Sequence, residues 1–563
     1  MKIKKGVEDR GGARRFMSGV LLLSFSTVIV KIIGLAFKIP MLSLLGAEGM
    51  GYFNSAYEIY ALLCVVSTAG LPVALSMMVS TARANDDVGR VKRVYRSAKL
   101  VFLVLGLGGS ILMLAFAREL AHFIGNDDAY LCIIAIAPAL LLVCLSSAIR
   151  GYCQGFEYMT PTAVSQLIEA VCKLIFGILF SIFAINKGYP VFAVSAFAVF
   201  GISVGSFASL IYLAVVKSLK RPERSITAKC HRSSNSTGRG VTRELIAIAL
   251  PITLGSAVLG LTRIIDMTLI MRRFAQMGVP IAESNKIYGA YTTLAVPVFS
   301  LIPALITPVS MALVPQLAAF AHRRDSEGER TVIENSLRLT VLLSMPASFG
   351  VTLFSRPILE LLFARQSEAI AISVPLLSAL GASVLFSCLI TTTNAILQSY
   401  RHVCLPIISM ALGVIVKLVS TYILLGIEEI GVLGAPIGSL LCNISVVAIN
   451  LCFMHSKTSA SLRAAAVFFK PLAASCVSVG GAFALYLYVY GYTGSVLTAF
   501  VPSIALALMA YVVISFLIGS LTLNDVMLLP FGEKIASVIH KNKNKRSAVL
   551  HKTDSEGDKN DCC

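Results

Sequence analysis

The sequence predicts an all-α polytopic membrane protein with fourteen transmembrane helices, arranged as two parallel six-helix lobes and a C-terminal helix pair. Composition is the first reason: 56 % of the residues are hydrophobic and 14 % are charged, whereas soluble domains carry about 25 % charged residues. The second reason is the recurrence of apolar runs of about 20 residues, the length that crosses a bilayer as a helix. The third is a weak internal repeat between the two halves of the chain.

The apolar runs fall into two sets of six and a final pair. The first set lies at 17–45, 54–80, 97–117, 129–149, 162–185 and 190–216. The second set lies at 244–271, 288–319, 333–355, 369–397, 403–425 and 430–454, and the pair lies at 467–488 and 496–519. The first, seventh, eighth and tenth runs are longer than a bilayer needs, so we expect these helices to tilt, kink or extend beyond the lipid.

The connections between the runs are too short for a folded soluble domain. The predicted segments are a basic N-terminus at 1–16, an N-lobe at 17–216, a linker at 217–243, a C-lobe at 244–454, accessory helices at 467–519 and a basic tail at 520–563. Most of the 48 Lys and Arg residues lie in the N-terminus, the linker, the tail and alternate loops. The positive-inside rule therefore predicts that both termini and the linker are cytoplasmic.

The formal net charge of +19 follows from this topology. The basic residues are divided among loops rather than gathered on one module, which favours contact with anionic membrane lipids and argues against nucleic-acid binding. Lys99, Arg338 and Lys470 lie at cytoplasmic helix ends, where we expect them to act as ordinary interfacial anchors.

The two halves of the chain share landmarks at a slowly growing offset, as duplication followed by small insertions would produce. The matching landmarks are Lys31–Gly34 with Arg263–Asp266 at an offset of 232, Leu114–Arg118 with Thr352–Arg356 at 238, and Cys144 and Lys173 with Cys388 and Lys417 at 244. Six spans per half is an even number, so both halves begin on the same side of the membrane. Parallel repeats of this kind place a central site between two bundles.

The most informative residues are five cations in the middle of predicted spans: Lys31, Lys38, Lys173, Arg263 and Lys417. A cation at the bilayer centre costs at least about 2.5–3.5 kcal/mol on insertion scales, so such residues normally face a cavity or a partner. The spans hold too few acids to neutralise all five: Glu58, Glu169 and Asp266. We therefore predict a water-filled, positively charged central cavity that accepts an anionic cargo.

Some of these cations have an acid within one helical turn. Glu169 precedes Lys173 by four residues, and Arg263 precedes Asp266 by three, so each pair could form a local salt bridge. The three acids could instead bind a coupling ion, H⁺ or Na⁺. Lys31 and Lys38 have no partner of this kind, and their spacing of seven places both on one helix face.

The repeat also predicts an asymmetry between its two matching lysines. Gly413 stands in the second lobe where Glu169 stands in the first. We therefore expect Lys417 to be the freer charge of the two. Replacing Lys417 should then impair transport more than replacing Lys173.

Prolines mark candidate hinges. The eighth span carries four and the second carries one: Pro297, Pro303, Pro308, Pro315 and Pro72. Each removes a backbone donor and weakens the local helix ladder. Static kinks and moving hinges are equally compatible with this pattern.

The sequence carries no pattern of a catalytic or metal site. All seven histidines lie in loops, at span edges or in the tail, and the cysteines show no ligand spacing. We predict no catalytic residue, no metal, no cofactor and no enzymatic activity. The membrane potential, H⁺ or Na⁺ would have to drive any transport.

Two segments resemble a known family. They are 46–76, with Gly46-Ala-Glu-Gly-Met-Gly51 and Ser67-Thr-Ala-Gly-Leu-Pro-Val-Ala-Leu-Ser76, and 150–169, with Arg150-Gly-Tyr-Cys-Gln-Gly155 and Met159-Thr-Pro-Thr-Ala-Val-Ser-Gln166. Both are similar to stage V sporulation protein B and the MurJ-type lipid II flippases, of the multidrug/oligosaccharidyl-lipid/polysaccharide exporter superfamily. The resemblance extends over 17–519.

The resemblance implies a V-shaped, MATE-like pair of lobes in a bacterial plasma membrane, with the C-terminal helices lining a hydrophobic groove. It implies a flippase that moves a polyprenyl-pyrophosphate-linked sugar, with lipid II as the leading cargo, and an association with the cell-wall synthesis machinery. By position, Lys31, Lys38 and Arg263 would meet the pyrophosphate. Lysine stands where these flippases commonly have arginine, and it binds phosphate as a point charge. Another lipid-linked repeat unit is the alternative cargo, and a drug or cation antiporter is the alternative transporter.

Overall fold

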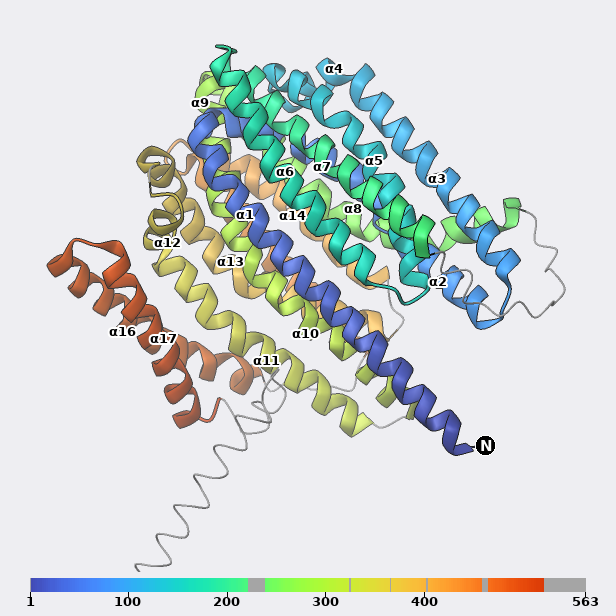
Figure 1. Ribbon diagram of the computed structural model, residues 1–563. Helices are drawn as coiled ribbons and strands as arrows, with labels where there is room; N and C mark the ends of the chain where they lie inside the picture. Colours follow the sequence, from blue (N-terminus) through green and yellow to red (C-terminus); the bar gives the residue numbers. More distant parts are fainter. Residues whose placement is uncertain are drawn as a thin grey trace, which may run out of the picture.

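The computed structural model describes residues 2–220, 238–323, 326–364, 366–400, 404–457 and 464–520. Within these ranges the regular structure is helical throughout, and the helices run roughly alongside one another (Figure 1). The predicted linker between 221 and 237 and the predicted tail from 521 onward lie outside the described residues.

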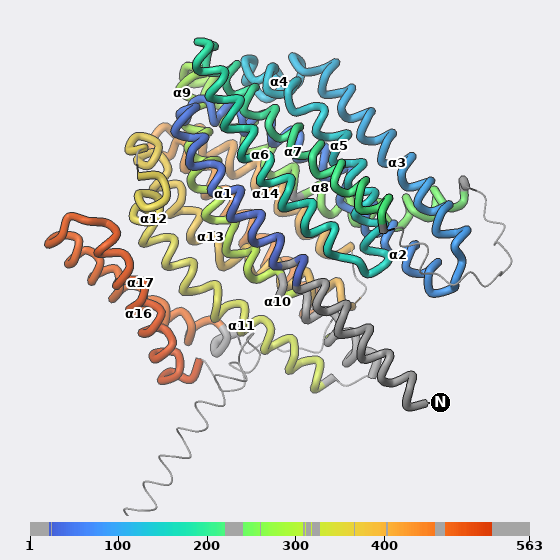
Figure 2. The backbone as a smooth tube through the Cα atoms, viewed as in Figure 1, coloured from blue at the N-terminus to red at the C-terminus, as the bar shows by residue number. Residues whose placement is uncertain are grey.

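The helices follow the order of the predicted spans, as the tube drawing shows (Figure 2). In the N-lobe they are α1 (Lys2–Thr68), α2 (Leu71–Ala84), α3 (Val88–Ala115), α4 (Ala117–Ile124), α5 (Tyr130–Gly155), α6 (Thr160–Asn186) and α7 (Val191–Lys220). In the C-lobe they are α8 (Gly238–Gln276), α9 (Ile281–Ala290), α10 (Val296–Arg323), α11 (Ser326–Leu353), α12 (Ser355–Leu362), α13 (Ser367–Ser399), α14 (Cys404–Leu425) and α15 (Gly434–Lys457). The accessory pair is α16 (Ala464–Thr493) and α17 (Val496–Leu517).

The described residues contain 13 helical segments that are long and apolar enough to cross a membrane. The first of these, Phe25–Ala84, holds two of the fourteen predicted spans. The chain reverses inside α1 at Gly46, whose φ of 67° is a left-handed backbone conformation that L-residues with a side chain rarely adopt. The multi-span prediction is confirmed, with the turn between the first two spans reduced to one glycine.

The second predicted span, 54–80, is wrong as a single helix. It breaks between Thr68 and Leu71, because Pro72 at the start of α2 has no N–H to donate to the carbonyl of Thr68. A Cβ on the intervening Gly70 would overlap the backbone carbonyl of Ala249. The break therefore lets α2 and α8 pack backbone to backbone.

The eighth predicted span is also divided. Between α9 and α10 the chain forms a π-helical turn, Tyr291–Ala295, in which the Val296 N–H donates to the carbonyl of Tyr291. The next donor in this register would be residue 297, which is a proline. The carbonyl of Thr292 is thereby left without its backbone partner.

The internal repeat is visible in the element bounds. The pair α3 and α4 occupies 88–115 and 117–124, and the pair α11 and α12 occupies 326–353 and 355–362, a constant offset of 238. Phe116 and Phe354 stand at the matching junctions with similar backbone angles, φ −110° and ψ 26° against φ −94° and ψ 20°. The two lobes are therefore built on one plan.

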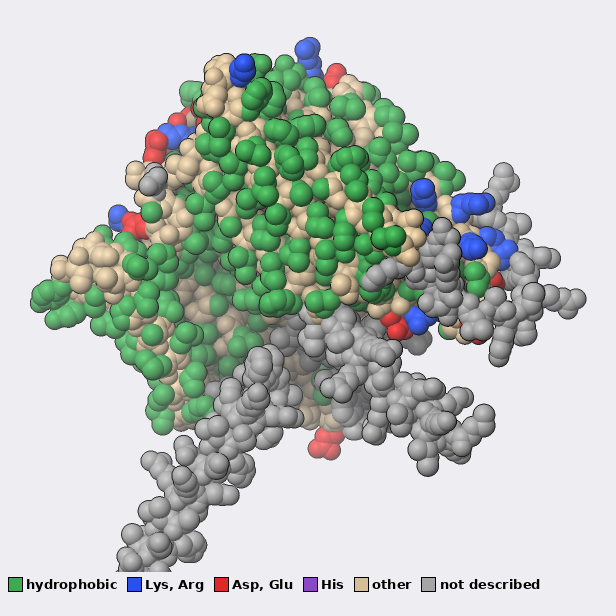
Figure 3. All heavy atoms as spheres, viewed as in Figure 1, with side chains coloured by type: hydrophobic (Ala, Val, Ile, Leu, Met, Phe, Trp, Pro, Cys, Tyr) green, Lys and Arg blue, Asp and Glu red, His purple; other side chains and the backbone are tan. Residues whose placement is uncertain are grey.

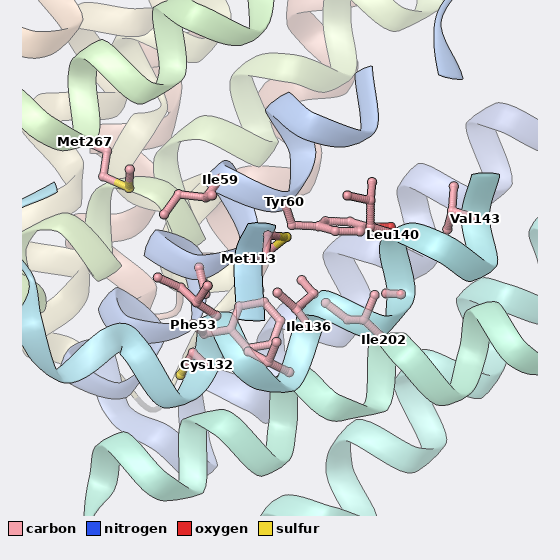
Figure 4. Close-up of a cluster of buried hydrophobic side chains, with 14 of the residues drawn as sticks. Phe53, Ile59, Tyr60, Met113, Cys132, Ile136, Leu140, Val143, Ile202 and Met267 are labelled. Carbon is pink, nitrogen blue, oxygen red and sulfur yellow. The ribbon is translucent and has the colours of Figure 1, made fainter. Parts of the chain in front are cut away.

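A continuous apolar core holds the N-lobe together and extends into α8, α9 and the start of α13. Figure 4 shows part of it, where Ile59 of α1 lies near Met267 of α8. The C-lobe has a separate core between α11, α13 and α15. The lobes are thus joined at one end of the molecule and have their own packing elsewhere.

The accessory pair covers one face of α11 and the end of α12. The hydroxyl of Tyr511 donates to the carbonyl of Leu342 at 2.6 Å, and the Arg338 guanidinium donates to the carbonyl of Ser520 at 2.7 Å. The face seen in Figure 3 has a broad apolar middle, with its charged side chains gathered toward the edges. This distribution matches a protein whose middle lies in hydrocarbon.

Candidate functional site

The two lobes meet tightly at the end of the molecule that carries Gly46 and α9, which we call the converging end. A Cβ on Gly51 would overlap the carbonyl of Asn285, and one on Gly289 would overlap the carbonyl of Ala47. The buried side chain of Asn126 also donates to Asn285 Oδ1 at 2.7 Å. Close backbone contact and a buried amide pair therefore seal this end.

Burial decreases along α1 away from the converging end. Met41 and Phe37 are buried, whereas Lys31 and Phe25, one to two turns and more toward the N-terminus, are exposed. A cavity of about 480 Å³ begins where this burial falls away, between α1 and α10. We call it the N-lobe cavity, because α1 and α6 supply most of its wall.

The N-lobe cavity collects most of the predicted cations. Among the described residues it is lined by five basic side chains and two carboxylates: Lys31, Lys38, Arg150, Lys173, Arg263, Glu58 and Glu169. When all are ionised, three positive charges remain uncompensated by the lining. A cavity of this sign attracts anions.

Lys38 already has an acceptor on the other lobe. Its Nζ donates to the carbonyl of Thr292 at 2.6 Å, which is the carbonyl that Pro297 leaves without a backbone partner. The amide of Asn54, also on α1, donates to the Thr292 and Thr293 hydroxyls at 2.9 Å. These bonds tie α1 to the π-helical turn, so Lys38 is both a cavity cation and an inter-lobe contact.

Lys173 faces aromatic rings. Its Nζ lies 5.1 Å from the ring centroid of Phe37 and 5.0 Å from that of Tyr57, within the range of a cation–π interaction. The local salt bridge considered for it has a stronger competitor, because Glu169 accepts a 2.8 Å bond from Arg150. Arg150 is therefore the salt-bridge partner of Glu169, in place of the Lys173 partner that the sequence spacing allowed.

Lys417 is the reverse case, and its predicted freedom is wrong. Its Nζ donates to Asp266 Oδ2 at 2.7 Å, and both residues are buried, with 5 % and 8 % of their surface exposed. The pair lies in a smaller cavity of about 200 Å³ between α8, α10, α13 and α14, the C-lobe cavity. The sequence places Asp266 within reach of Arg263 on its own helix, but the Asp266 carboxylate bonds Lys417 of α14 instead.

Arg263 and Glu58 are the charged residues of the wall between the two cavities, since both line each of them. Their nearest charged atoms are 3.9 Å apart, and the Arg263 side chain is 59 % exposed while that of Glu58 is 14 % exposed. This is a loose ion pair, so most of the guanidinium remains accessible from the cavities.

Sequence reasoning missed Arg150. Its guanidinium bonds Ser165, Glu169 and Ser209 on α6 and α7, at 2.8–3.0 Å. Arg150 is the first residue after the predicted span 129–149, so it does not read as an intramembrane cation, although α5 continues to Gly155. Its position in the quoted Arg150–Gly155 segment was the available signal.

The proline predictions are resolved in part. Pro72 begins α2, and Pro297 and Pro303 lie in α10, with Pro297 directly after the π-helical turn. Pro308 and Pro315 also fall within α10, where only the backbone is described. Whether any of them moves during function stays a prediction.

Comparison with known families and proteins agrees with this architecture. A model of the polysaccharide biosynthesis protein family matches residues 16–321, and the MatE family model matches residues 289–423. The chain is 26 % identical to stage V sporulation protein B of Bacillus subtilis over 427 residues, covering 75 % of this chain and 80 % of the relative. It is 25 % identical to lipid II flippase MurJ of the same organism over 418 residues, covering 72 % and 76 %.

Solved structures share the fold. A lipid II flippase MurJ in an inward closed conformation superposes with a TM-score of 0.66 at 15 % identity, covering 88 % of this chain and 98 % of that one. An inward-facing MATE-family multidrug transporter gives a TM-score of 0.60 at 15 % identity, covering 76 % and 98 %. The predicted two-lobed, MATE-like architecture is confirmed.

Proposed function

This chain belongs to the polysaccharide biosynthesis protein family, together with flippases of the MurJ and stage V sporulation protein B type, and we propose that it flips a lipid-linked anionic oligosaccharide precursor, with lipid II as the leading cargo. Its movement would be from the cytoplasmic to the outer leaflet of a bacterial plasma membrane, with both termini cytoplasmic. No chemical step on the cargo is part of the proposal.

The observation that carries the proposal is the uncompensated positive charge of the N-lobe cavity. A polyprenyl pyrophosphate has a compact anionic centre, and lysine ammonium groups bind phosphate as point charges. Lys38 lies deep in the cavity and Lys31 at its exposed side, so the two cations would contact the pyrophosphate in succession as it enters. A cationic drug would be repelled by the same lining.

The arrangement of the contacts supports a transport cycle of alternating access. The converging end is sealed by Gly51, Gly289 and the Asn126–Asn285 pair, while the N-lobe cavity lies between α1 and α10. The sealed end would be the outer side. The cavity would admit a headgroup from the cytoplasmic leaflet between the two helices, with the apolar tail remaining in lipid. Moving the polar headgroup through hydrocarbon would cost roughly several kcal/mol for each polar group that has no hydrogen-bond partner there.

The membrane potential is the driving force that we favour. One elementary charge moved across 100 mV is worth about 2.3 kcal/mol, and the N-lobe cavity holds more than one uncompensated charge. Asp266 is already engaged by Lys417, which makes it a poor binding site for an exchangeable ion in this conformation.

Complementation tests the proposal. Cells whose lipid II flippase can be depleted should grow when they express this chain, and should lyse when they express Lys38→Ala at equal membrane abundance. Lys187→Ala, which removes an exposed lysine far from the cavity, is the matched control. Lysis with the unaltered chain would exclude lipid II.

The alternative candidate cargo is another polyprenyl-linked repeat unit, which the description of the matching polysaccharide biosynthesis family favours. Binding assays on purified protein would distinguish this cargo from lipid II and from a cationic drug. Binding of undecaprenyl pyrophosphate without rescue of growth would indicate this second cargo. Absence of pyrophosphate binding, with export of cationic dyes, would support the drug antiporter.

A further inference from the structure

We propose that a crevice on the N-lobe, lined by other residues than the N-lobe and C-lobe cavities, is a binding site for an anionic phospholipid. The crevice has a volume of about 550 Å³ and lies between α3, α5 and α7. Its lining residues are Tyr95, Lys99, Leu145, Ile149, Leu210, Ala214, Lys217 and Ser218. It shares no residue with the N-lobe or C-lobe cavity, so the inference does not depend on which cargo is carried.

The crevice has a basic part and an apolar part. Lys99 and Lys217 bring two positive charges to it, near the end of α7 that leads into the linker. Leu145, Ile149 and Leu210 supply apolar walls. A phosphate group beside the lysines and acyl chains against the leucines would satisfy both parts, and basic pockets between helices on the cytoplasmic side commonly hold anionic lipid headgroups.

Lys217 is held in position by aromatic rings. Its Nζ lies 3.1 Å from the ring centroid of Tyr95 and 4.8 Å from that of Tyr152. Tyr152 in turn packs against Tyr95 and Phe156, with ring centroids 4.7 and 5.1 Å apart. The ammonium is therefore fixed at the protein surface rather than extended into water. The Lys99 side chain is exposed, so its ammonium can approach the same headgroup.

The repeat shows that this crevice is a departure from the common plan. At offsets of 238 and 244, Tyr95, Lys99, Leu145 and Ile149 correspond to four C-lobe residues: Ile333, Leu337, Leu389 and Thr393. Those four are buried, with at most 2 % of their surface exposed. Three of them belong to the closed C-lobe core, where Met454 and Phe468 also pack. The same place in the fold is filled and apolar in one lobe, and open and cationic in the other.

The alternative is that Lys99 is only the interfacial anchor that the sequence predicted. An anchor interacts with any headgroup layer, whereas a built site selects anionic over zwitterionic lipid and holds it longer than the surrounding lipid. Selectivity at the crevice, compared with another lipid-facing position on the same helix, separates the two.

The chain contains no tryptophan, which allows one to be introduced as a unique probe. Leu210→Trp places it in the crevice, and Val215→Trp places it on the lipid-facing side of the same helix, where Val215 is 50 % exposed and outside the crevice. Each protein is reconstituted in phosphatidylcholine vesicles containing brominated phosphatidylglycerol or brominated phosphatidylcholine. Fluorescence quenching then gives the relative affinity of each position for the two lipids.

We expect Leu210→Trp to favour phosphatidylglycerol by at least roughly five-fold, the effect of one basic residue near an anionic lipid, and Val215→Trp to show little preference. Lys99→Leu, which copies the C-lobe residue, should reduce the preference at Leu210→Trp by about the same factor. Lys187→Leu, which removes the same charge elsewhere, should leave it unchanged. Equal quenching by both lipids at Leu210→Trp, or a preference that Lys99→Leu does not reduce, would overturn the proposal. Lys38→Ala should weaken pyrophosphate binding and keep this lipid preference, so failure of either proposal is recognised separately.

Discussion

The N-lobe and C-lobe cavities place the same residue type at the same position of the repeat and treat it in opposite ways. Lys173 faces the rings of Phe37 and Tyr57, and the neighbouring carboxylate is bound by Arg150. Its counterpart Lys417 is buried in a 2.7 Å ion pair with Asp266. The same lysine of the repeat therefore lines an open cavity with its charge against aromatic rings in one lobe, and is neutralised in a buried ion pair in the other.

Replacing Lys417 should have the largest effect, and the effect should be on stability. Lys417→Ala leaves the Asp266 carboxylate buried without its partner, which costs about 3–5 kcal/mol. Thermal unfolding of the purified protein should show a large drop in Tm. The double variant Asp266→Asn/Lys417→Met should recover much of it, because no buried charge is left.

The matched control for this prediction is Lys173→Met, at the corresponding position of the N-lobe. It should lower Tm little and weaken pyrophosphate binding. If Lys173→Met destabilised the protein as strongly as Lys417→Ala, the two lysines would not have the different roles assigned here.

Replacing Lys38 should have the largest effect on binding. Lys38→Ala removes a charged donor from the N-lobe cavity, and a hydrogen bond to a charged group contributes about 1.5–3 kcal/mol, or roughly 10- to 100-fold in affinity. Equilibrium binding of undecaprenyl pyrophosphate to purified protein measures this. Lys38→Arg should retain most of the affinity, and an unchanged affinity in Lys38→Ala would place the anion elsewhere.

Replacing Arg150 should make the N-lobe resemble the C-lobe. In Arg150→Met, Glu169 loses its 2.8 Å partner and becomes available to Lys173, one helical turn away. We expect pyrophosphate affinity to fall by about ten-fold, or about 1.4 kcal/mol. The double variant Arg150→Met/Glu169→Gln should restore it. A loss that persists in the double variant would mean that Arg150 contacts the anion itself.

Replacing Pro297 should have the smallest effect, in the opposite direction. Pro297→Ala restores an N–H that can donate to the Thr292 carbonyl, which competes with Lys38 for that acceptor. Lys38 should then be more available, and pyrophosphate affinity should rise by roughly two- to five-fold. Pro303→Ala, on the same helix but next to a different carbonyl, should leave the affinity unchanged.

Much of the architecture follows from properties that can be read along the chain. Apolar length predicts spans because the cost of placing polar groups in hydrocarbon accumulates residue by residue. The parity of spans in each half predicts parallel lobes, and the constant offset between α3–α4 and α11–α12 agrees with the duplication. The cations of the cavities were visible for the same reason, since a charge within an apolar run is conspicuous wherever the run folds.

The partners of those charges were decided by the tertiary structure. Asp266 bonds Lys417, which is 151 residues away, and not Arg263 of its own helix. Glu169 likewise bonds Arg150 of α5, and not Lys173 one turn along α6. A salt bridge between helices depends on how each is rotated and shifted along its axis by a fraction of a turn. Packing sets those shifts, through contacts such as Gly70 on Ala249 and the π-helical turn before Pro297, and no periodicity in the sequence specifies them.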